Sequence, residues 1–141
     1  MEATNKSREG LVGLLLDRQA ASGNAVDAKT AAAVSKETGV PTAKIYGVTT
    51  FYAMFSNEQR GANLIRMCKS APCHVKGAKA VLRAFEKALG VACGQTTADG
   101  KFTLETCECL GICDVSPAVM INGEVFGSLT PEAVPGLLAK Y

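Results

Sequence analysis

Two close pairs of cysteines restrict what this chain can form more than any other feature of its sequence. Four residues separate Cys68 from Cys73, and three residues separate Cys109 from Cys113. Thiolates from two such pairs can converge on one tetrahedral metal site. The spacing therefore predicts a four-thiolate site, and by itself it fits an iron-sulfur cluster and a structural zinc ion about equally.

Turn-forming residues accompany both pairs. Pro72 and Gly111 lie inside them, and Pro117 follows the second pair. Glycine and proline let the backbone turn closely around a ligand and free its amide groups to point at sulfur. We therefore expect each cysteine pair to lie in a loop.

The cellular compartment determines whether the chain's six cysteines stay reduced or form disulfides. The opening residues, Met1 to Lys6, are polar and lack the basic region and long apolar core of a secretory signal. A cytoplasmic location is therefore expected, in which thiols stay reduced and metal binding or redox work is favoured over a disulfide framework.

Composition excludes several other classes of protein. The chain is 48% hydrophobic and 20% charged, as a typical globular protein is, and its formal net charge is only +2. No run of Lys or Arg is continuous in the sequence, so a nucleic-acid partner is not indicated. The longest apolar segment, residues 11–16, is far too short to cross a bilayer, and no membrane insertion is expected.

Three further residues near the pairs have simpler interpretations. His74 is the only histidine, whereas a Rieske-type cluster needs two, so a supporting role beside the sulfurs is expected. Cys107 could replace Cys109 if the loop shifted, but it is more simply a buried small hydrophobe at the end of a strand. Cys93 is expected to be structural or exposed.

Residues 1–58 contain no cysteine and are predicted to be wholly helical. Apolar residues recur at helical spacing within residues 11–16 and 31–34. Gly39 suits the end of the second helix, and Pro41 suits the start of a third. In that third helix, Ile45, Val48, Tyr52 and Phe55 recur at helical intervals and predict one stripe that is buried or faces a partner. The polar run over residues 56–61 is the best candidate for a domain boundary.

The pattern changes after this boundary to alternating strands and helices. Asn122-Gly123 is the dipeptide most favoured in a two-residue hairpin, and Pro135 predicts a short or bent final helix. We expect a strand at 63–67, a helix at 78–89 that ends at Gly90, a strand at 102–106, a hairpin over 118–128 and a helix from 130. In the second strand Phe102, Leu104 and Thr106 alternate with Thr103, Glu105 and Cys107, which predicts one buried apolar face and one polar face. This order predicts an α+β or α/β class, a helical bundle followed by a small two-layer domain with a mixed sheet.

At these residues the sequence resembles the 24 kDa subunit family of respiratory NADH dehydrogenase (complex I). This family includes the small iron-sulfur subunits of NAD-linked hydrogenases and formate dehydrogenases. The matching stretches are Gly47 to Tyr52, the first cysteine pair with His74 to Gly77, and Glu108 to Cys113 followed by Ser116-Pro117.

The resemblance implies a helical docking domain over residues 1–58 and a thioredoxin-like ferredoxin domain with a mixed four-stranded sheet over residues 62–141. It also moves the choice of metal from zinc to a 2Fe-2S cluster. The implied cluster ligands are Cys68, Cys73, Cys109 and Cys113. Residues implied to lie next to the sulfurs are His74, Gly111 and Pro117.

The same resemblance implies an electron-transfer subunit of an NAD-dependent oxidoreductase complex, with no complete active site in this chain. Its partner is an NADH-binding flavoprotein subunit that holds the FMN and NAD(H), beside further iron-sulfur subunits. Two alternatives stay open. One is a free-standing 2Fe-2S ferredoxin or redox sensor, and the other is a structural zinc module.

Overall fold

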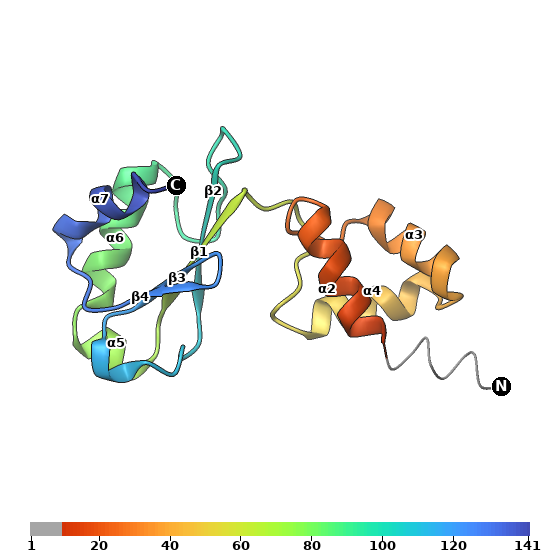
Figure 1. Ribbon diagram of the computed structural model, residues 1–141, viewed down its shortest axis with the longest axis horizontal. Helices are drawn as coiled ribbons and strands as arrows, with labels where there is room; N and C mark the ends of the chain where they lie inside the picture. The colour runs from red at the N-terminus through yellow and green to blue at the C-terminus, as the bar shows by residue number, and fades with distance from the viewer. Residues whose placement is uncertain (1–9) are drawn as a thin grey trace. The chain divides into compact units, whose positions relative to one another are not determined.

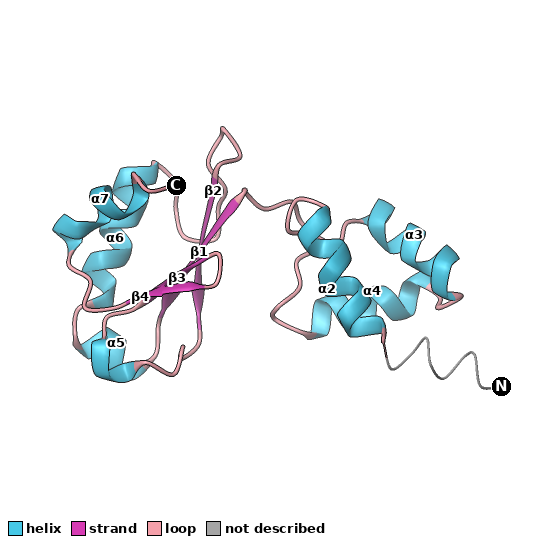
Figure 2. Cartoon of the chain, in the orientation of Figure 1, coloured by secondary structure: helices cyan, strands magenta, loops and turns pink. Residues whose placement is uncertain are grey.

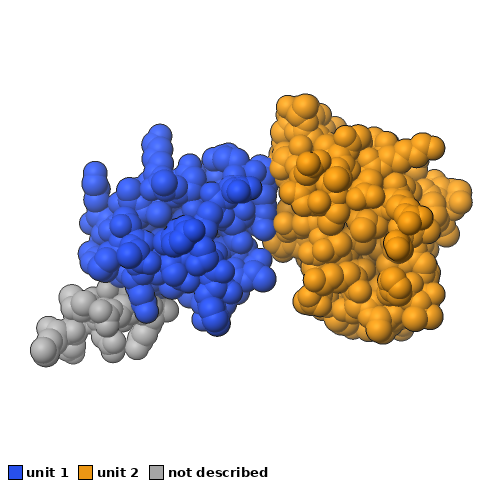
Figure 3. All heavy atoms as spheres, turned by 180° about the vertical axis from the view of Figure 1, so that it is seen from behind, with its two compact units in different colours: residues 1–60 blue, residues 61–141 orange. Residues whose placement is uncertain are grey.

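The computed structural model describes residues 10–141. Met1 to Lys6, on which the expectation about a secretory signal depends, lie outside the described residues. The chain divides into two compact units, whose described parts are residues 10–60 and 61–141 (Figure 3). The limits expected for the two domains, 1–58 and 62–141, and the docking role of the first stay predictions.

The first unit consists of three helices: α2 (Leu11–Ala21), α3 (Ala28–Thr38) and α4 (Thr42–Phe51) (Figure 1). The carboxylate of Asp27 caps α3 by accepting the Thr30 N–H at 2.8 Å. Gly39 ends α3 in the left-handed conformation, at φ 71°, as its sequence position predicts. One fully buried side chain from each helix, Leu15, Val34 and Ile45, contributes to a single core.

The apolar stripe of the third helix extends beyond that helix. Because α4 ends at Phe51, the next two predicted positions, Tyr52 and Phe55, lie in the turn that follows. Phe55 is buried, whereas Tyr52 is 41% exposed. The helical period therefore predicted the burial of Phe55 but not the exposure of Tyr52.

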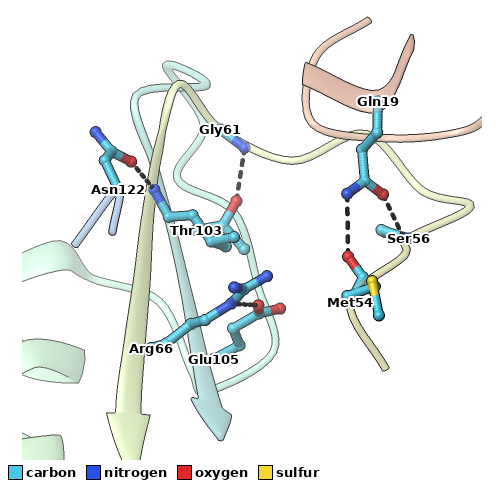
Figure 4. Close-up of polar contacts among 9 residues, drawn as sticks. Gln19, Met54, Ser56, Gly61, Arg66, Thr103, Glu105 and Asn122 are labelled. Atoms are coloured by element: carbon cyan, nitrogen blue, oxygen red, sulfur yellow. Dashed lines mark hydrogen bonds and ion pairs between the residues drawn. The ribbon is translucent and has the colours of Figure 1, made fainter. Parts of the chain in front are cut away.

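Gln19 holds this turn against α2 (Figure 4). Its side-chain amide donates to the Met54 carbonyl at 3.0 Å and accepts the Ser56 N–H at 2.9 Å. Gln19 is itself buried, so both of its polar atoms need partners inside the protein. The amide thus replaces backbone pairing where the chain leaves α4.

Replacement of this amide is expected to weaken the first unit. Gln19→Leu leaves the Met54 carbonyl and the Ser56 N–H without their partner, which costs about 1–3 kcal/mol of unfolding free energy. The neighbouring Arg18→Gln, which breaks only an exposed ion pair to Glu37, is the control and costs less than about 1 kcal/mol. Urea denaturation measures both, and equal losses would show that Gln19 contributes no more than a surface contact.

The second unit is a mixed four-stranded sheet with helices (Figure 2). The strands lie in the order β2-β1-β3-β4, with β1 parallel to β2 and antiparallel to β3. Its strands are β1 (Asn63–Cys68), β2 (Phe102–Cys107), β3 (Val119–Ile121) and β4 (Glu124–Phe126). Its α-helices are α5 (Ala71–Val75), α6 (Ala78–Leu89) and α7 (Val134–Leu138), and its 3-10 helices are η1 (Cys113–Val115) and η2 (Pro131–Ala133). The predicted mixed sheet with helices is confirmed.

The core of this unit lies between the sheet and α6 with α7, which Figure 1 shows on one side of the strands. In β1, Ile65 and Met67 are buried, whereas Arg66 between them is half-buried and forms an ion pair with Glu105 of β2 at 3.0 Å (Figure 4). Phe85 of α6 is fully buried in the same core. This alternation is what a sheet covered on one face produces.

Thr103 departs from the one-sided burial expected of the second strand. It is 4% exposed although it lies on the predicted polar face. Its hydroxyl accepts the Gly61 N–H at 2.6 Å (Figure 4). The same hydroxyl shares a hydrogen bond with the Thr96 hydroxyl at 2.8 Å. The start of the second unit and the turn before β2 therefore cover this side chain.

The hairpin and the final helix follow their sequence signals. Asn122 and Gly123 have φ values of 52° and 90°, as a two-residue turn of this type needs. The Asn122 side chain also accepts the Leu64 N–H at 2.9 Å, which ties the turn to β1. The last helical segment is η2 followed by the short α7, with Pro135 in the first turn of α7.

No helix within residues 10–141 is both long enough and apolar enough to cross a membrane.

Candidate metal centre

The first cysteine pair lies at the junction of a strand and a helix, not in the loop that its spacing predicts. Cys68 is the last residue of β1, and Cys73 lies in α5. Pro72 suits the first turn of that helix, where its missing N–H costs nothing. Both cysteines are only 2% exposed. Regular structure therefore holds both sulfurs in defined positions.

The second pair lies in the loop after β2, as expected. Cys109 is exposed, and Cys113 begins the 3-10 helix η1. Their sulfur atoms are 3.4 Å apart, and the Gly111 N–H donates to the Cys109 sulfur at 3.3 Å. Gly111 adopts φ 82°, which favours glycine because a side chain there is strained. The turn thus aims one backbone amide at a sulfur.

The electrostatics of Cys68 connect the two pairs. Burial disfavours its thiolate, but the backbone of Ser70, the Cys73 thiol and the backbone of Leu110 favour it, and together they lower the pKa of Cys68 below its ordinary value. Leu110 belongs to the second cysteine turn, so that turn lies near enough to influence a sulfur of the first pair.

The electrostatics of Cys113 show the same proximity. Its pKa is raised, first by the hydrogen bond with Cys109, then by burial, and then by the negative charges of Cys109, Cys73 and Cys68. Such mutual opposition to ionisation is typical of thiols that share one site without a cation between them. All four predicted ligands therefore lie in one electrostatic neighbourhood.

The donor set fits a two-iron cluster. Each iron of a 2Fe-2S cluster takes two protein ligands, and the four free thiols come as two close pairs. Within residues 10–141, no three Cys, His, Asp or Glu side chains are grouped closely enough to bind one metal ion. Four cysteine thiolates are also the ligands of structural zinc sites, so the donor set by itself fits both metals.

An ion pair that the sequence did not predict joins the two cysteine segments. Lys69 follows Cys68 directly, Glu108 precedes Cys109, and the Lys69 Nζ lies 2.9 Å from a Glu108 carboxylate oxygen. The Lys69 N–H also donates to the Cys107 carbonyl at 3.0 Å. The only sequence signal for this contact was that residues of opposite charge stand next to Cys68 and Cys109.

The remaining cysteines differ in their distance from this site. Cys107 pairs in register with Cys68 across β1 and β2. Burial, followed by the negative charge of Cys68, raises the pKa of Cys107 to about 11 and favours its neutral thiol. Cys93 follows the C-terminal end of α6, whereas Cys73 precedes the N-terminal end of that helix. The Cys93 N–H donates to the Glu86 carboxylate at 3.0 Å.

His74 and Pro117 differ in their exposure beside the site. His74 is exposed, and its side chain lines a small concavity together with Cys68 and Lys69. Pro117 is buried immediately before β3, and the Cys68 N–H donates to the carbonyl of the next residue, Ala118, at 3.2 Å. Both residues therefore border the cysteines without any described bond to a sulfur.

Comparison with known protein families identifies the group to which this arrangement belongs. The profile of the thioredoxin-like [2Fe-2S] ferredoxins matches residues 1–141. The chain belongs to this family. Membership confirms the predicted thioredoxin-like fold class and the 2Fe-2S cofactor. It therefore decides in favour of an iron-sulfur cluster over a zinc ion.

Relatives of known name include components of larger complexes. A subunit of the NADH-quinone oxidoreductase of Escherichia coli K12 is 42% identical over 109 residues, which cover 77% of this chain and 66% of that protein. The HndA subunit of the NADP-reducing hydrogenase of Solidesulfovibrio fructosivorans is 40% identical over 102 residues, 72% of this chain and 60% of that protein. The chain thus matches just under two thirds of the length of these relatives.

A solved structure supports the same grouping. The crystal structure of an NAD+-reducing [NiFe]-hydrogenase in the air-oxidised state contains a chain that matches 93% of this one, with a TM-score of 0.81 and 26% identity. The match covers 22% of that chain. The predicted resemblance to subunits of NAD-linked complexes is therefore confirmed.

Proposed function

We propose that this chain is an electron-transfer subunit of an NAD-linked oxidoreductase complex of the NADH dehydrogenase, hydrogenase or formate dehydrogenase type. Cys68, Cys73, Cys109 and Cys113 hold one 2Fe-2S cluster, which supplies one-electron chemistry when bound. The chain exchanges single electrons with the FMN of a partner flavoprotein subunit that also binds NAD(H). The ion pair of 2.9 Å between Lys69 and Glu108 carries this proposal, because it joins the residue after Cys68 to the residue before Cys109 and so brings the two cysteine segments together.

The burial of the four cysteines suits this role. Cys68 and Cys73 are buried, so the protein shields one side of the cluster from water. Cys109 is exposed, so the other side lies near the surface, where an electron partner can approach. Amides directed at the sulfurs, such as that of Gly111, and exposure to solvent are two of the factors that set the potential of iron-sulfur centres.

The helical unit favours a subunit over a free-standing ferredoxin or redox sensor. Around the end of α4, Tyr46 is 63% exposed, Phe51 is 78% exposed, and Tyr52 and Met54 are each 41% exposed. The rings of Phe51 and Tyr52 pack edge to face with centroids 5.0 Å apart. Exposed groups of large apolar side chains are typical of protein interaction sites, and we assign this surface to the flavoprotein or a neighbouring iron-sulfur subunit. The cytoplasmic location stays a prediction.

Anaerobic purification of the full chain tests the cofactor. We expect about two irons and two sulfides per chain and a rhombic electron paramagnetic resonance signal after reduction. A colourless protein that contains zinc would contradict the proposal. Recovery of the cluster without any flavoprotein in repeated native purifications would favour the free-standing alternative, which shares the cluster but not the complex.

The ion pair between Lys69 and Glu108 is expected to slow loss of the cluster. Lys69→Gln and Glu108→Gln each remove the contact that joins the two ligand segments, so the holoprotein is expected to release iron to a chelator about two- to five-fold faster. Loss of the visible absorbance measures the rate. Arg18→Gln, which breaks a similarly exposed pair in the helical unit, is the control and leaves the rate unchanged. Equal rates in all the variants would contradict a positioning role for this pair.

A further inference from the structure

A row of positive charges follows the outer face of α6. Lys76 lies just before the helix, and Lys79, Arg83 and Lys87 lie within it at intervals of three and four residues. All four are exposed, whereas Ala78, Val81 and Phe85 of the same helix face the core. We call Lys76, Lys79, Arg83 and Lys87 the basic ladder. At 1.5 Å per residue, its members from Lys79 to Lys87 span about 12 Å along the helix.

No described ion pair neutralises the basic ladder. No ion pair between residues of the described chain, 10–141, includes a member of the ladder. The only acidic residue of α6 is Glu86, and one of its carboxylate oxygens accepts the Cys93 N–H beyond the end of the helix. The members of the ladder are not adjacent in the sequence. They lie close together only because residues three or four apart share one face of a helix.

The basic ladder begins beside the cysteines. Lys76 donates to the carbonyl of Asp114 in η1, the helix that starts at Cys113, at 3.4 Å. Lys79 lines the concavity that also contains Cys68, Lys69 and His74. The row of charge therefore leads directly to the first cysteine pair.

The concavity is too small for a nucleotide. Its volume of about 120 Å³ is well below the ~300–1,000 Å³ of typical small-molecule sites. Its apolar lining includes Ala78 and Leu82, and its cations come from Lys69 and Lys79. A space of this size and charge suits a side chain of another protein, such as a carboxylate, better than a flavin or a nicotinamide cofactor.

We propose that the basic ladder and this concavity form the docking surface for an acidic face of a protein that exchanges electrons with the cluster. The partner meets this surface where Cys68 lines the concavity, which is a second approach to the cluster besides the one at the exposed Cys109. This inference rests on the proposed function, because it needs a redox centre at the cysteines. A cluster with four thiolate ligands is itself negative and repels acidic proteins, and the ladder offsets that repulsion and steers their encounter.

Two small oxidants of opposite charge test the field of the ladder near the cluster. Ferricyanide and hexaamminecobalt(III) each accept one electron from the reduced cluster, which returns to its oxidised state. In the variant Lys79→Gln/Arg83→Gln/Lys87→Gln, stopped-flow oxidation by ferricyanide at low salt is expected to slow about three- to ten-fold, and oxidation by the cobalt complex to accelerate. Both differences should disappear at high salt, which shortens the screening length to a few ångströms.

A matched variant controls for net charge. Lys29→Gln/Lys36→Gln/Lys44→Gln removes three exposed lysines from the helical unit, and the rates for both oxidants are expected to stay within about two-fold of the unmodified chain. If this control slows ferricyanide as much as the ladder variant does, or if the ladder variant changes neither rate, the proposal is overturned.

Docking itself is tested with poly-L-glutamate as an acidic polypeptide. Nuclear magnetic resonance shifts on titration are expected to concentrate on α5, α6 and the concavity, and to vanish in the ladder variant. Shifts elsewhere, or tighter binding of the ladder to phosphatidylserine vesicles or duplex DNA, would overturn the proposal. Because this titration needs no cluster, it separates failure of the docking surface from failure of the proposed function, which absence of iron from the unmodified chain would reveal.

Discussion

Cys109→Ser is expected to lose the 2Fe-2S cluster or retain it only in a severely destabilised form. The substitution removes the thiolate that lies 3.4 Å from the Cys113 sulfur and accepts the Gly111 N–H. A serine hydroxyl remains protonated at neutral pH and is a much poorer ligand for iron than a thiolate. Iron content and visible absorbance of the anaerobically purified variant measure the loss.

Cys107→Ser is the matched control, because it removes a cysteine two residues away. Cys107 lies in β2, in register with Cys68, and not in the turn that carries Cys109 and Cys113. This variant is expected to keep about the iron content of the unmodified chain, since four thiolates already complete the site. Equal loss from both variants would mean that Cys109 is wrongly chosen as the third ligand.

Phe85→Ala is expected to cause the largest loss of stability among core substitutions of the second unit. Phe85 is fully buried where α6 packs against the sheet. Truncation removes the apolar contacts of the ring and leaves a cavity, which together cost about 3–5 kcal/mol of unfolding free energy. Typical domains have only about 5–15 kcal/mol of stability, so partial unfolding at moderate temperature is also expected.

Phe51→Ala makes the same chemical change at an exposed position. The Phe51 side chain is 78% exposed at the end of α4, so its truncation is expected to cost less than about 1 kcal/mol. Urea denaturation of the full chain compares the two variants. If Phe51→Ala destabilises the chain as much as Phe85→Ala, burial of Phe85 does not account for its contribution.

Local signals predicted many helix and turn boundaries. Gly39 and Gly90 end their helices in the left-handed conformation, and Asn122-Gly123 forms the predicted turn. These predictions succeeded because each depends on a few adjacent residues whose allowed φ angles the residue types restrict. The exposure of Tyr52 and the burial of Thr103 were not predicted, because they depend on which distant segment covers each side chain.

The cysteine spacing predicted which residues form the candidate site, but not the secondary structure and the contacts that hold them. It predicted two turns, whereas Cys68 and Cys73 lie in a strand and a helix. It also could not place Cys107 opposite Cys68, since the register of parallel strands depends on packing across the whole sheet. The ion pair of Lys69 with Glu108 depends on the same register, because it joins residues at the ends of β1 and β2.

The sequence by itself determined which residues are available as ligands, the helix ends at Gly39 and Gly90, and the position of the hairpin, because these depend on short-range spacing and turn chemistry. Only the tertiary structure decided that the ion pair of Lys69 with Glu108 joins the two cysteine segments and that the basic ladder leads to Cys68. Contacts between segments that are distant in sequence form only when the sheet aligns and α6 packs on it. Short-range spacing in the sequence is therefore enough to choose the candidate thiolates. Their approach to one another depends on the packing of the whole domain.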